Sequence, residues 1–460
     1  MSRVLVLCTF DRLLTTILFL AIGLTCGLTP IQTDTWWQLR AGQDMWNSGR
    51  VVLTDTYSHT AHGAFWANHE WLAEVIFYAI FRVGGLGSLT LFAAALIMCA
   101  WALTWRLMRG PVQQKFIWAL LALPPSAVWW EPRPHAFSLL FIILTVFLMV
   151  SRRYWWLPPI FLVWANVHGG VLLGFVLLAG GAAALALTER RVPWRLLLVV
   201  LLCLAAATAT PLGLSFWTEI PKSLGRIGQY TFDEWRRPGF LEVPMLPFWG
   251  IAAVFCVTLL QRWRRALLDS DLAVLCACAL AMLPGAVMSV RHVGPFVMVA
   301  LPAVSGLIPT REQAPHKSLE RPRFNLAVML IAVSAVALVL FTAYRNEWAR
   351  LRWMPVPAKA LEAVRLCEGN LYNRYDEGGY LLWFVPERKV FLDGRQDPFP
   401  PDLVLEHIEI ETGRATHRGV FERYHISCAF LPVRSPVTAN LERDRWTAIY
   451  RDRRWVVFRK

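Results

Sequence analysis

Charged side chains are scarce in this sequence. Asp, Glu, Lys and Arg make up 17% of its 460 residues, whereas apolar residues reach 56%. A soluble globular protein carries about 25% charged residues to cover the surface that faces water. The shortage excludes a cytosolic enzyme, a secreted protein and a disordered chain, and it indicates a polytopic membrane protein. The 23 tryptophans also indicate a membrane protein, because the indole ring favours membrane–water interfaces.

The sequence also lacks cysteines with the spacing of a metal site, internal repeats, and a basic surface pattern typical of nucleic-acid binding. Its nine cysteines follow no zinc spacing, and Cys276 and Cys278 lie in an apolar run, where packing explains them. Of the net charge of +14, residues 344–460 carry +4. The remaining +10 lies in short clusters between apolar runs, a pattern typical of membrane topology rather than of DNA binding.

Eleven apolar runs predict membrane-spanning helices, which need about 20 residues each. Two of the runs are short, one of them interrupted by Pro124-Pro125, so the number carries a margin of two. The predicted spans are 13–30, 86–107, 116–130, 135–150, 154–167, 171–187, 194–210, 245–261, 271–289, 293–309 and 325–343.

The basic clusters orient these spans. If the N-terminus is cytoplasmic, the breaks between spans on the inner side contain 17 Lys and Arg residues, and the breaks on the outer side contain 9. Basic residues are retained on the cytoplasmic side. The first run lacks a small-x-small exit, so we expect an uncleaved span and not a signal peptide. An odd number of spans then places residues 344–460 outside the cytoplasm, in a multi-pass protein of a bacterial plasma membrane.

Two regions are predicted to lie outside the bilayer. In the outer loop 31–85, segments 35–48 and 71–83 read as interfacial helices, the second broken from the next span by Gly84-Gly85. A second outer loop covers 211–244. In the C-terminal region, strands are predicted at 371–372, 389–392, 426–431, 446–450 and 455–458, and helices at 355–367, 400–412 and 436–444.

The predicted fold is therefore an all-α polytopic membrane domain, residues 1–343, followed by an extracytoplasmic α/β domain, residues 344–460. In an oxidising compartment Cys367 and Cys428 are able to pair. Because the sequence does not give their separation, we do not expect the pair to form.

Ionisable residues gather at the predicted outer ends of the spans, where they are costly and therefore functional candidates. The candidates are Asp34, Asp55, His69, Glu70, Glu131, Arg133, His168 and Arg291, with Asp376, Asp393 and Arg395 in the C-terminal region. Carboxylates accept a proton as general bases, and arginines clamp a phosphate through paired hydrogen bonds. This combination suits a membrane-embedded donor that carries a phosphate.

Each candidate also has a structural interpretation. Asp34 is a favoured N-cap for a helix that starts at Thr35. Asp55 and Asp393-Gly394 suit turns, and Glu70 is a favourable charge at the start of helix 71–83. His69 suits an interfacial hydrogen bond, His168 belongs to a tight hairpin with Gly169-Gly170, and Arg133 and Arg291 are long enough to reach the interface from within the bilayer.

The first outer loop resembles that of the GT-C superfamily of glycosyltransferases. The residues that carry the resemblance are Asp34-Thr-Trp-Trp-Gln-Leu-Arg40, Gly42, Gly49, Asp55-Thr-Tyr-Ser58 and His69-Glu-Trp71. In the tail, Tyr375-Asp-Glu-Gly-Gly-Tyr380 and Val390-Phe-Leu-Asp-Gly-Arg395 are similar in arrangement to the Trp-Trp-Asp-Tyr-Gly region of oligosaccharyltransferase subunits. Protein mannosyltransferases and aminoarabinose transferases are further members of this superfamily. The resemblance covers the whole chain in architecture.

The resemblance implies transfer of a sugar from a polyprenyl-phosphate-linked donor to an extracytoplasmic glycan, lipid or protein, with inversion at the anomeric carbon. Asp34 matches the catalytic Asp that follows the first span in that superfamily, as base or as ligand of acceptor and metal, with Glu131 and Asp55 in support. Arg133, Arg291 and His168 would bind the lipid phosphate, while His69, Glu70, Asp376, Asp393 and Arg395 would bind the substrates. A divalent cation, Mg²⁺ or Mn²⁺, is the one cofactor it implies, held by Asp34 and Glu131.

The sequence departs from the superfamily at two motifs. The Trp-Trp-Asp-Tyr-Gly motif is absent, so recognition of a peptide acceptor does not carry over. An Asp-x-Asp in the second outer loop is absent too, and Glu131 is the nearest substitute. The alternative function is a transporter or flippase for a lipid-linked or small solute. Transporters place charges near the midplane in paired repeats, whereas these spans are almost free of charge.

Overall fold

The computed structural model describes residues 8–227, 233–308, 321–345 and 356–460. The chain forms two compact units. The first unit comprises residues 1–29, 86–213 and 231–347, and the second comprises 30–85, 214–230 and 348–460. The first outer loop therefore belongs to the same compact unit as the C-terminal segment.

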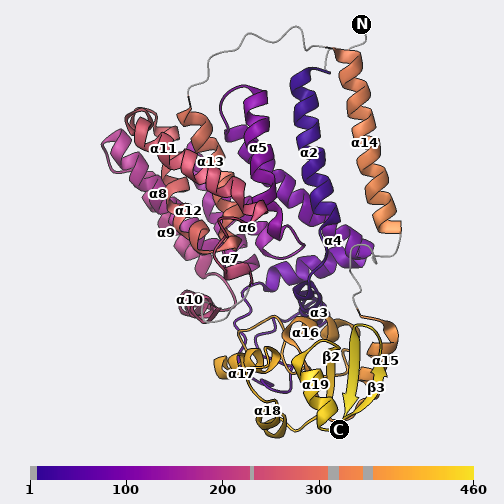
Figure 1. Ribbon diagram of the computed structural model, residues 1–460. Helices are drawn as coiled ribbons and strands as arrows, with labels where there is room; N and C mark the ends of the chain where they lie inside the picture. Colours follow the sequence, from indigo (N-terminus) through magenta and orange to yellow (C-terminus); the bar gives the residue numbers. More distant parts are fainter. Residues whose placement is uncertain (1–7, 228–232, 309–320, 346–355) are drawn as a thin grey trace. The chain divides into compact units, whose positions relative to one another are not determined.

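The first unit is a bundle of helices (Figure 1). It contains α2 (Phe10–Leu28), residues 86–107 of α4 (Trp71–Leu107), α5 (Val112–Ser126), α6 (His135–Val150), α7 (Leu157–Val167), α8 (Val171–Glu189), α9 (Trp194–Thr208), α11 (Leu246–Leu268), α12 (Ser270–Met288), α13 (Val293–Leu307) and α14 (Pro322–Arg345), with short 3₁₀ turns between several of them. A helix thus lies at each of the eleven predicted positions.

Helices of the described residues differ in how well they suit a membrane. Seven segments are long and apolar enough to cross one, namely α2, α4, α8, α12 and α14, and also α11 and α13 with the 3₁₀ turns before them (Val243–Leu268 and Val290–Leu307). Helix α13 is apolar and buried along all of its 15 residues, as expected of a helix enclosed by neighbours. Helix α14 packs beside α2, and most of its side chains remain exposed. This is the polytopic membrane fold that composition predicts.

Polar contacts at one end of the bundle agree with the predicted topology. Arg109 pairs with Asp269, and Arg152 Nη2 lies 2.6 Å from Ser270 Oγ and 3.3 Å from Asp271 Oδ1. Gln113 Nε2 donates to Asp11 Oδ1 over 3.0 Å. These residues come from the breaks that the charge pattern places on the cytoplasmic side. The breaks therefore meet at the same end of the helices.

The second unit joins helices of the first outer loop to a small sheet. Its helices are α3 (Thr33–Ser48), residues 71–83 of α4, α10 (Phe216–Ile227), α15 (Ala358–Leu366), α16 (Tyr375–Phe384), α17 (Pro401–Glu411), α18 (Arg418–Arg423) and α19 (Pro436–Arg443). The strands are β1 (Asn370–Asn373), β2 (Ile426–Pro432), β3 (Thr447–Arg451) and β4 (Trp455–Arg459), in the order β1-β2-β4-β3. Strand β1 is parallel to β2, and the other pairs are antiparallel (Figure 1).

Glycines allow α3 to pack closely inside this unit. A Cβ on Gly42 would overlap the carbonyl oxygen of Glu74, and a Cβ on Gly379 would overlap that of Thr33. Trp36 completes the contact between α3 and α16, with its ring centroid 4.7 Å from that of Phe384. Helix α4 breaks at Gly84 and Gly85, as the sequence predicts, because Gly85 adopts a positive φ of 64°.

Two predictions for the C-terminal region were wrong. Segment 389–392 is not a strand, because Val390 makes only an isolated bridge with Ser58. Gly378 lies in α16, where a Cβ would overlap the carbonyl oxygen of Leu392. Cys367 and Cys428 do form a disulfide, since the pairing of β1 with β2 brings their Cα atoms to 5.9 Å.

Candidate active site

Asp34 lies in the first turn of α3. The helix begins at Thr33 with Gln32 as its N-cap, so Asp34 does not cap it. Trp37 Nε1 donates to Asp34 Oδ1 over 3.1 Å, which orients a carboxylate that is only partly buried. A Cβ on Gly394 would overlap the same oxygen. Asp34 is therefore a fixed carboxylate that borders a position where only glycine fits.

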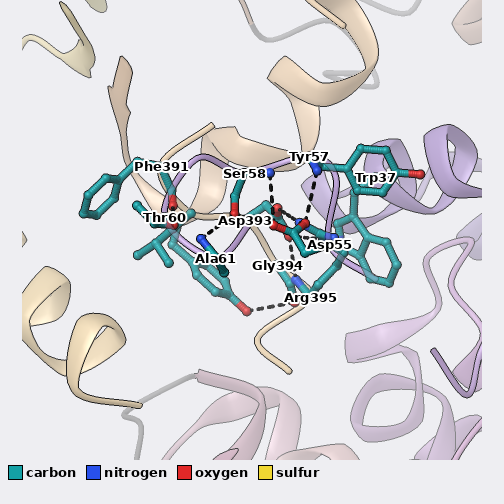
Figure 2. A network of polar contacts seen from close by, with 12 residues as sticks. Trp37, Asp55, Tyr57, Ser58, Thr60, Ala61, Phe391, Asp393, Gly394 and Arg395 are labelled. Atoms are coloured by element: carbon teal, nitrogen blue, oxygen red, sulfur yellow. Dashed lines mark hydrogen bonds and ion pairs between the residues drawn. The ribbon is translucent and has the colours of Figure 1, made fainter. Parts of the chain in front are cut away.

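A fully buried ion cluster lies behind Gly394 (Figure 2). Arg395 donates from Nε and Nη2 to Asp393 over 2.8 and 2.6 Å, and its Nη2 lies 2.7 Å from Asp55 Oδ1. The guanidinium also lies 4.8 Å from the ring centroids of both Tyr57 and Trp66. Burial lowers the pKa of Arg395, but Asp393 and Asp55 raise it more, so the side chain stays charged.

Besides its ion pair with Arg395, Asp55 accepts hydrogen bonds within the turn that the sequence suggests. Its carboxylate accepts from Tyr57 N over 3.2 Å, from Ser58 N over 3.3 Å and from Ser58 Oγ over 2.5 Å. Both carboxylates of the cluster are 0% exposed. Because buried charges are retained only when they are paired, Arg395 holds loop 55–58 against loop 393–395. The geometry gives Asp55, Asp393 and Arg395 a positioning role around Gly394.

A second polar chain in this unit joins α3 to residues 69–70. Gln38, one turn after Asp34, donates from Nε2 to Glu70 Oε2 over 3.3 Å, and its buried Oε1 has no hydrogen-bond partner. His69 Nε2 lies 3.9 Å from Glu70 Oε1. Asp376 differs from these residues, because its side chain is 64% exposed and lies 3.4 Å from Arg374 Nη2.

The first unit contains a separate polar cluster in the loops at the other end of its helices from Arg109 and Arg152. Glu234 Oε1 accepts from Arg133 Nη1 over 3.0 Å, and Glu234 Oε2 accepts from Arg291 Nη1 over 2.8 Å. Arg291 also lies over the ring of Trp235, 5.4 Å from its centroid. Burial raises the pKa of Glu234, but the two arginines lower it more, to about 2. Glu234 is thus an ionised link between arginines from two different loops.

His168 extends this cluster. Its Nε2 lies 3.2 Å from Arg291 Nη2, and its Nδ1 accepts from the backbone N–H of Gly170 over 3.0 Å. Ser138 Oγ lies 2.7 Å from the same Nδ1 and accepts from Trp164 Nε1. The convergence of Glu131, Arg133, His168 and Arg291 that topology predicts is therefore present in the structure.

Glu131 is the buried acid of the cluster. Its Oε1 lies 3.4 Å from Arg133 Nη1, whereas its buried Oε2 has no hydrogen-bond partner. Burial raises the pKa of Glu131 to about 7, although Arg133 opposes the shift. A carboxyl group that titrates near neutral pH is able both to accept and to release a proton under physiological conditions.

Sequence reasoning places Glu234 and Gln38 in polar outer segments but gives neither of them a role. Glu234 stands beside Trp235 and Arg236 in a loop whose polar residues are visible in the sequence. The signal for it was the presence of two arginines near the bilayer without an assigned carboxylate partner. Gln38 had no comparable signal, because its role depends on the packing of α3 against residues 69–70.

The described residues contain no group of three His, Cys, Asp or Glu side chains placed to hold a metal ion. Among the contacts of Asp34 are the indole N–H of Trp37 and the close approach of Gly394. The divalent cation that the resemblance implies stays a prediction.

No protein-family model and no curated protein matches the sequence. Among solved structures, the archaeal oligosaccharyltransferase AglB from Archaeoglobus fulgidus, in complex with an inhibitory peptide and a dolichol-phosphate, matches with a TM-score of 0.61 and 12% identity, over 91% of this chain and 69% of that chain. The apo form of the Archaeoglobus fulgidus oligosaccharyltransferase gives 0.59 at 11% identity, over 92% and 69%. ArnT from Cupriavidus metallidurans gives 0.52 at 15% identity, over 96% and 97%.

At these identities the likeness is one of fold. It confirms the predicted architecture, a polytopic helical membrane domain followed by a C-terminal domain with a small sheet.

Proposed function

We propose that this chain, which has the GT-C fold, is an integral-membrane glycosyltransferase. Its donor is a sugar linked to a polyprenyl phosphate, and its acceptor is an extracytoplasmic glycan, lipid or protein. The dolichol-phosphate in the AglB structure supports a lipid-phosphate donor by analogy of fold. The single observation that carries the proposal in this chain is the convergence of Arg133, Arg291 and His168 at one end of the bundle.

The geometry of His168 supports an anion at this cluster. Its Nδ1 accepts from the Gly170 N–H, so a neutral imidazole carries its proton on Nε2. That proton faces Arg291 Nη2, which is itself only a donor, across 3.2 Å. An anionic oxygen beside them is able to accept from both donors. A phosphate oxygen suits this position, and the planar guanidinium binds phosphate through paired hydrogen bonds.

Asp34 supplies the carboxylate for the acceptor. In the proposed step, the acceptor hydroxyl oxygen forms a bond to the anomeric carbon while the bond from that carbon to the phosphate oxygen breaks. The hydroxyl proton passes to Asp34, and the electron pair leaves with the polyprenyl phosphate. Attack opposite to the leaving group inverts the anomeric carbon. Trp37 orients Asp34 for this role, and the cluster of Asp55, Asp393 and Arg395 places Gly394 beside it.

The remaining assignments follow from the same proposal. Glu131, with its free buried oxygen, supports proton transfer near the arginines. Glu70 and His69 contribute to substrate binding beside Asp34. We place the protein in a bacterial plasma membrane with a cytoplasmic N-terminus. The Cys367–Cys428 disulfide supports an extracytoplasmic second unit, because disulfides persist in oxidising compartments.

The test uses purified full-length protein in detergent with a panel of radiolabelled polyprenyl-phosphate sugars and a membrane extract as source of acceptor. We expect one donor to be consumed, and we expect Asp34→Asn to abolish its consumption. Asp402→Asn, an exposed aspartate of α17, serves as the matched control. An arm with EDTA decides whether a divalent cation is needed. Absence of turnover with every donor would refute the proposal and favour a transporter.

A further inference from the structure

The second unit contains a pocket that none of the assignments above uses. It has a volume of about 270 Å³, just below the roughly 300 Å³ at which small-ligand pockets begin. Its lining includes polar residues of α10 and the segment 397–401. Phe65 stands at its rim with 55% of the residue exposed, and Phe399 is buried in its lining.

The charges in the lining balance. Lys222 and Arg226 face Glu219 and Asp397, so the pocket offers two cationic donors and two anionic acceptors. Lys222 Nζ lies 3.6 Å from Glu219 Oε2, while Asp397 Oδ1 accepts from Ser223 Oγ over 2.5 Å. A free anion or cation gains little from a lining without net charge. A neutral ligand whose hydroxyls both donate and accept uses all of these groups.

The pocket lining also contains apolar groups. Phe65, Phe399 and three prolines, Pro398, Pro400 and Pro401, present flat carbon surfaces between the charged groups. A sugar ring has hydroxyls around its edge and C–H groups on its faces, so it matches polar groups and an aromatic rim together. The pocket thus combines the two kinds of contact that a neutral glycan requires.

The position of the pocket within its own unit connects it with Asp34. Gly394 lies against Asp34 Oδ1, and Asp397 follows only three residues later. Three residues span at most about 11 Å. Arg395 also lies over Phe399, 5.8 Å from the ring centroid, so the buried ion cluster supports the pocket lining as well. A ligand in this pocket is therefore held on the same short segment that borders the candidate base.

We propose that this pocket binds a sugar residue of a neutral glycan, and that the acceptor of the reaction is such a glycan. The second part rests on the proposed function, since it names the substrate class for that activity. Glu219 and Asp397 accept hydrogen bonds from sugar hydroxyls, Lys222 and Arg226 donate to their oxygens, and Phe65 packs on the face of the ring.

The first test measures binding and does not depend on turnover. A Pro400→Cys protein, changed at an exposed residue of the lining, is placed in lipid nanodiscs and labelled with a maleimide, and the labelled site is identified by peptide mapping. The probes are methyl glycosides of glucose, galactose, mannose and N-acetylglucosamine. We expect at least one to slow labelling threefold or more, and Phe65→Ala in the same protein to remove the protection. Lys359→Cys, exposed on α15, is the control and should be labelled at the same rate with and without sugar.

Three results would overturn the pocket proposal. They are equal labelling with every glycoside, equal protection of Lys359→Cys, and stronger protection by sulfate or by a short Ser- and Thr-containing peptide. The second test uses octyl glycosides as acceptors. Glu219→Gln should raise the apparent KM for the glycoside at least tenfold and leave the KM for the donor unchanged, while Glu362→Gln, exposed on α15, should change neither. An unchanged KM in Glu219→Gln would refute the acceptor assignment, whereas no consumption of donor by the unmodified protein would refute the proposed function instead.

Discussion

The buried ion cluster of the second unit makes a sharp prediction about Arg395. The change Arg395→Met keeps most of the volume of the side chain and removes its charge. Asp55 and Asp393 then remain 0% exposed without a cation within ion-pair distance, since both depend on the same guanidinium. Removing one partner of a buried ion pair typically costs about 3–5 kcal/mol. For a unit of roughly 150–250 residues, each kcal/mol lowers the Tm by about 2–4 °C.

We therefore expect the second unit of Arg395→Met to unfold roughly 6–20 °C below the unmodified protein. The assay is thermal proteolysis of the full-length protein, with cleavage sites in residues 356–460 read by mass spectrometry. Arg423→Met is the matched control, because Arg423 pairs with Glu406 at the surface and should leave the transition unchanged. Adding Asp55→Asn and Asp393→Asn to Arg395→Met should restore part of the loss, since neutral amides need no cation. Equal transitions for Arg395→Met and Arg423→Met would refute the view that this cluster holds the unit together.

Three further predictions concern the same unit. The Cys367–Cys428 disulfide closes a separation of 61 residues, so replacing both cysteines with serine should destabilise the unit by about 4 kcal/mol, read by denaturant-dependent proteolysis; no change would contradict this. Burial raises the pKa of Glu377 from its ordinary 4.5 to about 8, so between these values the folded state retains a proton that the unfolded state has released, and stability should fall as pH rises from about 4.5 to 8. Glu377→Gln should flatten that dependence, and an equal slope in both proteins would count against it. Gly394→Ala places a Cβ against Asp34 and should lower sugar transfer at least tenfold, whereas Gly419→Ala, with open space around it, should not; equal activities would remove Gly394 from the site.

The membrane helices were predictable because their signal is local. A run of apolar residues determines a spanning helix by itself, and basic clusters determine which breaks share a side. Alternation of the two sides then brings Glu131, Arg133, His168 and Arg291 to one end without any knowledge of contacts. The break at Gly84-Gly85 and the helices at 35–48 and 71–83 were predictable for the same reason.

The contacts between distant segments were not predictable. The ion pair between Asp55 and Arg395 joins residues separated by more than 300 positions, and each residue taken alone suits a turn. Segment 389–392 has the composition of a strand, but its neighbours in space are loops that offer one bridge only. The disulfide depends on the parallel pairing of β1 with β2, which no local pattern specifies.

The central claim is that two polar sites divide the work of sugar transfer, with arginines for the donor phosphate and Asp34 for the acceptor. The most direct measurement compares donor binding with donor consumption in two variants of the full-length protein. We expect Asp34→Asn to bind the polyprenyl-phosphate sugar as tightly as the unmodified protein and to transfer none of it. We expect Arg291→Lys to weaken donor binding at least tenfold, because lysine keeps the charge and loses the paired hydrogen bonds. Normal transfer by Asp34→Asn, or unchanged donor binding by Arg291→Lys, would contradict the account.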